Sequence, residues 1–539
     1  MSRSLSGIGI GREAATGQVL RFTRDPRVEE TRTSSLGVDQ EIAALRSAIA
    51  QAGDDVRAQV EGSDPDTAAI LDALLMVIED DELITMATPH LERGLDAASA
   101  LFGALDDLNA LMGDDEDFQS RVGDLRGIAR SISTHLRGLD ATTTIPHTGE
   151  WVVVAEDLTP LDTAQFTNSV VGVVTELGGP TSHTAIICRA RNIPAVVSVT
   201  GAMELPDGEW VLVDPAGHRV VEGADLSVAT VPISFIPTLD EPLVTVRANI
   251  GSLADAQAAA DTLARGIGLF RTEVLYLDRQ SQPTMTEQAS ELAEVFRVAP
   301  AGTIIVRTID AGSDKPVAFL PGKSEENPAL GVRGFRLGRA HPEFQEDQLL
   351  AIKAAIDATG RHVQVMAPMI STVEEATEFR EMAKKAGLPE VGIMVETPAI
   401  VPMIPDLAGI VDFVSIGSND LSQYLFAADR QHPAMGGLVD PWQPGLLRTI
   451  DTIVQHAAPA VIPVGVCGEA GSDPLLAIVL AGLGVSSVSA APSAVAAVRD
   501  ALSSLTKAQA QDIARAVVAE TSANRARDVA TDALASVSQ

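Results

Sequence analysis

The stretch Gly178–Ile186, which reads Gly-Gly-Pro-Thr-Ser-His-Thr-Ala-Ile, contains the histidine best suited to chemistry. The apolar, β-branched run 170–174 precedes it and predicts a buried strand. The glycines allow a tight turn, and Thr181 or Ser182 can cap a helix that begins near His183. The imidazole would then lie at a helix N-terminus, which favours an anion such as a phosphoryl group on the ring. A single histidine in a glycine-rich turn is, however, more often a structural hydrogen-bonding residue.

Two arginines end consecutive predicted strands in the second half of the chain. Arg271 ends the run 267–271, and Arg307 ends the run 304–307. Guanidinium groups bind phosphate bidentately and stay charged, so two of them at adjacent strand ends could clamp one phosphoryl group. Each arginine alone would more often be an ion-pair partner, but their shared position favours phosphate binding.

Oxygen ligands and a thiol follow later predicted strands. Glu396 ends the fifth apolar run, Asn419 and Asp420 follow the sixth, and Cys467 ends the seventh. Because Mg²⁺ prefers oxygen ligands and often takes only one or two carboxylates, Glu396 and Asp420 predict a magnesium site. Arg430 could supply a third phosphate contact. A buried cysteine is by default a small apolar filler, but at this position we expect Cys467 to be a proton donor.

The second half of the chain must hold these side chains at one end of a sheet. Eight strand-like runs alternate with helical stretches and predict a (β/α)₈ TIM barrel over residues 244–539. Polar residues follow most of these strands, and such barrels carry their active sites at the carboxyl ends of the strands. The eight runs are 244–250, 267–271, 304–307, 363–366, 392–396, 413–416, 461–467 and 485–488.

The first half of the chain predicts a second α/β domain with a helical insertion. Short strand-like runs in residues 1–22 should pair with strands of residues 141–223, where the His183 stretch lies. Residues 37–140 show apolar residues at helical spacing, which predicts an inserted four-helix bundle. Residues 224–243 contain three prolines and no amphipathic pattern, so they predict a linker.

Composition narrows the possible partners. The 539 residues carry a net charge of −34, which disfavours nucleic acid and anionic membranes and favours a basic protein partner. Residues 37–140 alone hold 22 Asp and Glu against 7 Lys and Arg. The two cysteines lack metal or redox spacing, which excludes a disulfide framework. No apolar stretch reaches membrane-spanning length and residues 1–20 lack a signal-peptide core, so we expect a cytoplasmic protein.

The string around His183, together with Arg-Ala-Arg-Asn-Ile-Pro-Ala-Val at 189–196, resembles a known phosphohistidine region. Enzyme I of the phosphoenolpyruvate (PEP)–sugar phosphotransferase system, PEP synthase and pyruvate phosphate dikinase share that region. The residues at the barrel strand ends resemble the PEP-utilising barrel of Enzyme I, and the resemblance covers nearly the whole chain. It implies a multidomain α/β protein with an N-terminal phosphohistidine domain. The Pro-rich linker departs from the long helix that joins the halves of well-studied members.

The resemblance also implies roles for individual residues. His183 would carry the phosphoryl group and Cys467 would protonate the enolate. Mg²⁺ would be held by Glu396 and Asp420. Thr163 would lie close to the phosphohistidine, and Lys315 and Arg333 are weaker candidates. The residues implied to bind PEP are Arg271, Arg307, Asn419, Asp420 and Arg430.

A reaction and partners follow from the same resemblance. The protein would take the phosphoryl group of PEP onto His183 and pass it to the carrier protein HPr, docked on residues 37–140, for coupled sugar uptake. A dimer through the barrel is implied. A PEP synthase or pyruvate phosphate dikinase would also need an ATP-grasp domain, for which residues before 148 have neither the length nor the nucleotide loop. A regulatory Enzyme I paralogue is a second alternative, and a helical adaptor on a degenerate barrel is a third.

Overall fold

The computed structural model divides the chain into two compact units, which we describe separately. One unit comprises Met1–Ile233 with Gln431–Gly437, and the other comprises Ser234–Arg430 with Leu438–Gln539. The structure describes residues 3–11, 14–60, 65–112, 116–139, 145–179, 182–191, 193–215, 218–223, 235–277, 279–312, 316–320, 325–430 and 435–537. Thr181, Lys315 and residues 224–234 of the predicted linker lie outside these ranges, and residues 235–243 form neither helix nor strand.

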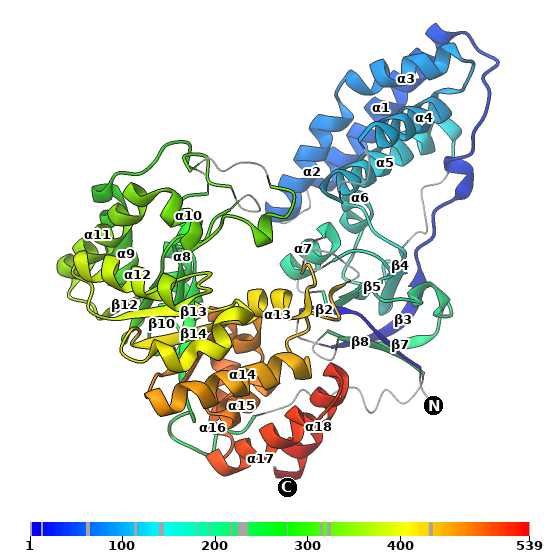
Figure 1. The fold of residues 1–539 in the computed structure, drawn as a ribbon. Coiled ribbons are helices and arrows are strands. Elements are labelled where there is room, and N and C mark those ends of the chain that lie inside the picture. Colours follow the sequence, from blue (N-terminus) through cyan, green and yellow to red (C-terminus); the bar gives the residue numbers. More distant parts are fainter. Residues whose placement is uncertain are drawn as a thin grey trace. The chain divides into compact units, whose positions relative to one another are not determined.

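An eight-stranded sheet forms the centre of the first unit, in the order β1-β8-β7-β3-β4-β5-β6-β2 (Figure 1). The strand that follows the N-terminal segment, β3, runs parallel to β4 and antiparallel to β7. The predicted pairing of residues 1–22 with the later strands is therefore confirmed. The strands are β1 (Ser4–Ser6), β2 (Ile8–Ile10), β3 (Ala15–Arg21), β4 (Trp151–Ala155), β5 (Val170–Thr175), β6 (Ala195–Val197), β7 (Trp210–Asp214) and β8 (Arg219–Glu222).

A helical bundle is inserted between β3 and β4, as predicted, but its helix count differs. The described part contains five helices rather than four: α1 (Val38–Val60), α2 (Pro65–Ile78), α3 (Glu82–Glu92), α4 (Ala97–Met112) and α5 (Glu116–Arg137). The Asp80 carboxylate accepts the backbone N–H of Glu82 at 2.9 Å, which favours a new helix start after α2 has ended. Buried Leu, Ile and Ala side chains, including Leu45, Ile84 and Leu101, fill the bundle interior.

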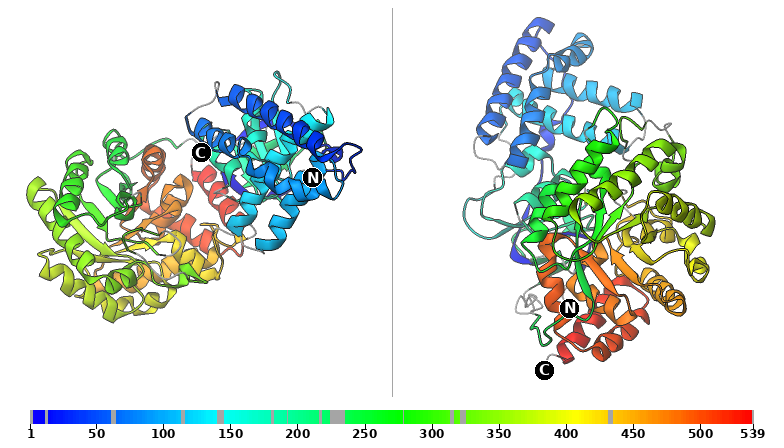
Figure 2. Two further views of the ribbon diagram at one scale, coloured as in Figure 1. Left: turned by 90° about the horizontal axis from the view of Figure 1, so that it is seen from above. Right: turned by 90° about the vertical axis from the view of Figure 1, so that its left-hand side faces the viewer.

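The second unit is a closed barrel of eight parallel strands, β9 to β16, which confirms the predicted (β/α)₈ fold. The helices lie outside the ring of strands, as both Figure 1 and Figure 2 show. The strands are β9 (Thr245–Ile250), β10 (Ile267–Arg271), β11 (Ile304–Arg307), β12 (Val363–Ala367), β13 (Val391–Val395), β14 (Phe413–Gly417), β15 (Val464–Cys467) and β16 (Ser487–Ala490). The outer α-helices are α8 (Leu253–Ala260), α9 (Met285–Val298), α10 (Phe335–Ala340), α11 (Pro342–Thr359), α12 (Val373–Lys385), α13 (Ser418–Phe426), α14 (Pro444–Ala457), α15 (Pro474–Leu483), α16 (Val495–Ser503), α17 (Lys507–Val518) and α18 (Ala523–Val537).

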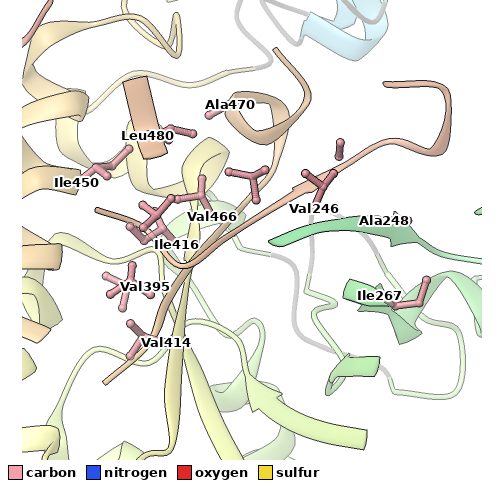
Figure 3. Close-up of a cluster of buried hydrophobic side chains, with 14 of the residues drawn as sticks. Val246, Ala248, Ile267, Val395, Val414, Ile416, Ile450, Val466, Ala470 and Leu480 are labelled. Atoms are coloured by element: carbon pink, nitrogen blue, oxygen red, sulfur yellow. The ribbon is translucent and has the colours of Figure 1, made fainter. Parts of the chain in front are cut away.

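Aliphatic side chains hold the helices onto the barrel. Val414, Ile416 and Val466 on the strands gather with Ile450 of α14 and Leu480 of α15 (Figure 3). A second, smaller cluster that includes Leu269, Met394 and Cys467 comes from strand residues that alternate with these and fills the barrel interior. Because both faces of the strands are buried, the strand sequences read as continuous apolar runs, which is why the eight strands could be predicted. No helix among the described residues is long and apolar enough to cross a membrane.

Candidate active site

His183 begins the helix α7 (His183–Ala190), which follows the end of β5 at Thr175. Ser182 is the N-cap, and its hydroxyl accepts the Ala185 N–H at 3.3 Å. Gly178 has a φ of +88°, a conformation that side-chain-bearing residues rarely adopt, and it turns the chain between strand and helix. The predicted strand–turn–helix around His183 is thus present, and the partly exposed histidine lies in the first turn, where N–H groups favour an anion.

Helix α6 (Pro160–Ala164), which carries Thr163, packs against α7. The buried Thr163 hydroxyl donates to the Pro160 carbonyl of its own helix at 3.0 Å. The hydroxyl of Thr184 donates to the Leu158 carbonyl at 3.1 Å, which ties α7 to the loop before α6. The nearness of Thr163 to the imidazole stays a prediction.

A chain of alternating charges crosses the mouth of the barrel, at the carboxyl ends of the strands. The Arg307 guanidinium contacts Glu273 Oε1 at 2.5 Å through Nη2 and Asp310 Oδ2 at 2.9 Å through Nη1. Arg333 reaches the same Asp310 oxygen at 2.9 Å and Asp420 Oδ1 at 3.0 Å. These five groups are all buried. The structure therefore brings the predicted Arg307 and Asp420 together through two groups, Asp310 and Arg333.

The acidic groups of this chain keep its arginines charged although they are buried. Burial alone would lower the pKa of Arg307, but the carboxylates of Glu273 and Asp310 raise it above its ordinary value. Burial acts in the same way on Arg333, and Asp310 and Asp420 raise its pKa. Both guanidinium groups thus remain cationic at any physiological pH.

Arg271 differs from Arg307 although the two residues pair in register at the ends of β10 and β11. The Arg271 side chain is exposed and makes no ion pair with a described residue, whereas Arg307 contacts two carboxylates. Arg430 is intermediate: its Nη1 lies 3.4 Å from Asp420 Oδ2, and its side chain is 25% exposed. Arg271 therefore offers uncommitted positive charge at the rim and Arg430 a charge only loosely paired with Asp420, whereas the charge of Arg307 is already compensated.

Glu273 and Glu396 each have one buried oxygen without a partner among the described residues, but only Glu273 forms an ion pair there. The Oε1 of Glu396 accepts the Met369 N–H at 2.7 Å, while Oε2 is buried without a hydrogen-bond partner among the described residues. A Cβ on Gly417 would lie 2.5 Å from Oε2, so only glycine leaves room for the carboxylate. Burial, then the Asp420 and Asp310 carboxylates, raise the pKa of Glu396 to about 8.

The donor set at the mouth fits a divalent cation that takes few protein ligands. Four buried carboxylates, those of Glu273, Asp310, Glu396 and Asp420, share the described mouth with two buried guanidinium groups. No group of three or more His, Cys, Asp or Glu side chains among the described residues is arranged as a metal site. Mg²⁺ needs only one or two carboxylates, with water and substrate completing its shell, so the free oxygen of Glu396 is a suitable ligand.

Asn419 and Cys467 lie beside this cluster. Asn419 is in the first turn of α13, and its Oδ1 accepts the Glu469 N–H at 3.1 Å, which turns the amide NH₂ toward other partners. The Cys467 thiol donates to the Ile416 carbonyl at 3.3 Å and accepts the Ser415 hydroxyl at 3.6 Å. Burial raises the pKa of Cys467 to about 11, so the thiol is held protonated.

Three groups at the mouth were not predicted, or only in part. Glu273 and Asp310 were not among the predicted site residues, and Arg333 was only a weaker candidate. A signal was present, because Asp310 follows Arg307 by three residues and Glu273 follows Arg271 by two, directly after strand ends. Arg333 follows no strand, so only the folded chain reveals its position between two carboxylates.

We expect the stability of the metal-free barrel to fall as pH rises, because Glu396 must ionise without a cation. A folded-state pKa above the ordinary value means that the folded protein binds the proton more tightly than the unfolded chain. Stability is then greatest at low pH and is lost between about pH 5 and pH 8. At about 1.4 kcal/mol per pKa unit, the loss should reach a few kcal/mol. Urea unfolding in the presence of a chelator measures it.

Two variants and added Mg²⁺ test the cause of this decline. Glu396→Gln should reduce the loss of unfolding free energy with rising pH. Glu374→Gln, at an exposed position of α12, should leave that loss unchanged. Mg²⁺ should remove the decline from the unmodified protein and affect Glu396→Gln less. An identical pH slope in Glu396→Gln and the unmodified protein would contradict the assignment.

Comparison with known proteins agrees with this arrangement. The chain matches three families: "PEP-utilising enzyme, PEP-binding domain" over 228–507, "PEP-utilising enzyme, mobile domain" over 148–217 and "PEP-utilising enzyme, N-terminal" over 6–121. It is 37% identical to a phosphoenolpyruvate-protein phosphotransferase of Streptomyces coelicolor, over 98% of this chain and 99% of that protein. It is 36% identical to one of Haloferax volcanii, over 98% and 99%. The chain therefore belongs to the phosphoenolpyruvate-protein phosphotransferase family, whose members are PEP-utilising enzymes.

Proposed function

We propose that this enzyme is the general Enzyme I of a PEP-dependent sugar phosphotransferase system. It takes the phosphoryl group of PEP onto His183, releases pyruvate, and passes the phosphoryl group to a histidine of HPr. It acts as a dimer formed through its barrel. The observation that carries the proposal is the pairing of two sites in one chain. A histidine lies at a helix N-terminus in one unit, and a buried Arg–carboxylate cluster lies at the barrel mouth of the other.

Charge at the mouth supports binding of PEP. Phosphoryl transfer needs positioning and charge stabilisation more than covalent help from the protein. Arg271 offers uncommitted positive charge, Arg430 is only loosely paired with Asp420, and Arg307 stands beside Arg271 in register. The amide NH₂ of Asn419 can donate to the carboxylate or phosphate of the substrate. Together these groups would hold the three phosphate oxygens that do not take part in bond exchange.

Mg²⁺ would be held by Glu396 and Asp420 and would neutralise charge on the substrate while it is bound. The unpartnered Oε2 of Glu396 supports this assignment. Asp420 already accepts from Arg333 and Arg430, which orient its carboxylate. The arginines therefore fix the ligand before any cation arrives, which lowers the reorganisation that binding requires.

The proposed reaction combines phosphoryl transfer to His183 with protonation of the enolate by Cys467. A ring nitrogen of neutral His183 attacks phosphorus, and the bond between phosphorus and the enol oxygen breaks. The enolate takes a proton at its terminal carbon from the Cys467 thiol, which forms pyruvate and leaves a thiolate. Ser415, whose hydroxyl lies 3.6 Å from Sγ, can donate to that thiolate. Because His183 and the barrel belong to different units, the reaction requires the two units to meet.

Relatives support this reading over PEP synthase or pyruvate phosphate dikinase. Phosphoenolpyruvate-protein phosphotransferases match 98% of this chain, so their similarity includes the helical bundle as well as the barrel. The acidic surface of that bundle supports a basic carrier. A groove of about 370 Å³ lies between α1 and the turn from α2 to α3. Four acids line it, against two arginines that pair with three of them: Asp54, Glu79, Asp80 and Asp81, with Arg46 and Arg57.

His183→Ala should abolish self-phosphorylation, because no other group of this chain is proposed to accept the phosphoryl group. Incubation with radiolabelled PEP and Mg²⁺, followed by detection of acid-labile label on the protein, measures the loss. His147→Ala, which changes an exposed histidine of the same unit, should label normally. Label on His183→Ala at the normal level would refute the assignment.

Cys467→Ala should slow pyruvate formation from PEP by about 10²- to 10⁴-fold, the range expected for loss of a general acid. It should spare the return transfer from phosphorylated HPr to His183, which needs no proton at carbon. Cys188→Ala is the matched control, because Cys188 is the other buried thiol and lies in α7. Equal damage to both directions in Cys467→Ala would indicate a structural thiol instead.

Charge reversal of Asp80 and Asp81 to lysine should slow transfer to HPr about tenfold at low salt, because it removes attraction for a basic partner. Self-phosphorylation from PEP should not change. Asp81 loses an exposed contact with Arg46, which is worth little to stability. The control reverses Asp528 and Asp532, exposed acids of α18. Rapid-quench kinetics at two salt concentrations measure the effect, and unchanged rates at low salt would argue against docking here.

A further inference from the structure

A single buried glutamine of the outer helix α11 joins the ends of two barrel strands. Gln348 is 0% exposed, and its Oε1 accepts the Ile309 N–H at 3.0 Å. Its Nε2 donates to the Thr272 hydroxyl at 3.2 Å, and that hydroxyl donates to the Arg307 carbonyl at 2.8 Å. The three hydrogen bonds therefore connect α11 with the residues that follow β10 and with the end of β11.

The bonded residues are neighbours of the charged groups at the mouth. Thr272 lies between Arg271 and Glu273, and Ile309 directly precedes Asp310. The side chains of Glu273 and Asp310 carry ion pairs at the mouth, whereas Gln348 forms hydrogen bonds with the Ile309 backbone and the Thr272 hydroxyl. A shift of either strand end would change the separation of Arg271 and Arg307, which pair in register.

Gln345, one turn earlier on the same helix, shows that burial alone does not produce this pattern. It is 1% exposed, yet neither of its amide atoms has a hydrogen-bond partner among the described residues. A Cβ on Gly338 would overlap its Oε1 at 1.3 Å, so glycine makes room for the Gln345 side chain. Both residues carry the same amide group, lie in the same helix and are equally buried. Only Gln348 forms hydrogen bonds with the residues at the strand ends.

We propose that Gln348 is a positioning residue for the phosphate clamp, and this proposal rests on the proposed function of Arg271 and Arg307. Its side chain fixes the spacing of the two arginines by holding Thr272 and Ile309 at once. A buried amide with both partners in place costs little, whereas an apolar side chain of equal size would leave the Ile309 N–H and the Thr272 hydroxyl to find other partners. A displacement of about 1 Å in such a clamp can cost about 10²-fold in rate.

The test compares Gln348→Met with Gln345→Met, because methionine preserves side-chain volume and removes the amide. Gln348→Met should lower kcat/KM for self-phosphorylation from PEP by about 30-fold, within the range for a misplaced clamp. Return transfer from phosphorylated HPr to His183 should stay normal, since it does not use the barrel mouth. Gln345→Met should match the unmodified enzyme in both assays. Equal kcat/KM in the two variants would overturn the proposal.

A second pair of variants keeps the test decisive if Gln348→Met proves unstable. Thr272→Val removes the hydroxyl that links Gln348 to Arg307, and Thr272→Ser keeps it. Thr272→Val should lose activity with PEP to a similar extent, and Thr272→Ser should restore it. The double variant Thr272→Val/Gln348→Met should lose little more than either single variant, because both disrupt one hydrogen-bond chain. If the loss of activity in the double variant equals the product of the losses in the two single variants, the proposal is overturned.

Arg307→Met separates this inference from the proposed function. Suppose that Arg307→Met impairs labelling from PEP, while Gln348→Met and Gln345→Met have equal kcat/KM for self-phosphorylation. The phosphate clamp is then supported, and the role proposed for Gln348 is wrong. If Arg307→Met labels normally, the clamp itself is wrong. Thermal unfolding of each variant completes the comparison, since a purely structural role for Gln348 would lower the unfolding temperature and damage both transfer directions together.

Discussion

The barrel mouth depends on one constraint: more negative than positive charge is buried there. Four carboxylates share the described mouth with two buried guanidinium groups. Arg307 and Arg333 each bridge two acids, so Asp310 is fully compensated, whereas Glu273 and Glu396 each keep an oxygen without a partner among the described residues. PEP is itself an anion and would be repelled by such a mouth. The proposed Mg²⁺, together with Arg271 and Arg430 at the rim, would reverse that balance.

Backbone geometry keeps this unfavourable arrangement in place. Met369, which donates its N–H to Glu396, has a φ of +59°, a strained conformation for a residue with a side chain. Gly417 supplies the space in which the Glu396 carboxylate lies. The closed barrel can hold such strain because its strands are buried on both faces by aliphatic packing. The free energy gained by packing in the core thus offsets the cost of buried charge and backbone strain at the mouth. This is usual for sites that must be organised before a ligand binds.

The sequence was sufficient for the barrel and for residues that directly follow strands, because parallel strands place their carboxyl ends together. Arg307 and Asp420 were found in this way. It was insufficient for contacts set by side-chain direction. Arg333 follows no strand, and Gln348 in an amphipathic helix reads like any polar residue. The extra bundle helix arises from a break between Ile78 and Glu82, which periodicity does not reveal. The contacts of Arg333 and Gln348 join segments distant in sequence, whereas each success concerns local pattern and topology.

The barrel mouth and the His183 helix differ in their exposure to water. The charged cluster at the mouth is buried, whereas His183 is partly exposed. A phosphate clamp is strongest when water is excluded, so Arg307 and its acids are buried on rigid strand ends. Under the proposed function His183 receives a phosphoryl group and delivers it to another protein, which agrees with its partly exposed position at the start of an eight-residue helix. One fixed site could not satisfy both demands. A division into two compact units lets each environment be optimised separately and makes the meeting of the two units part of the reaction.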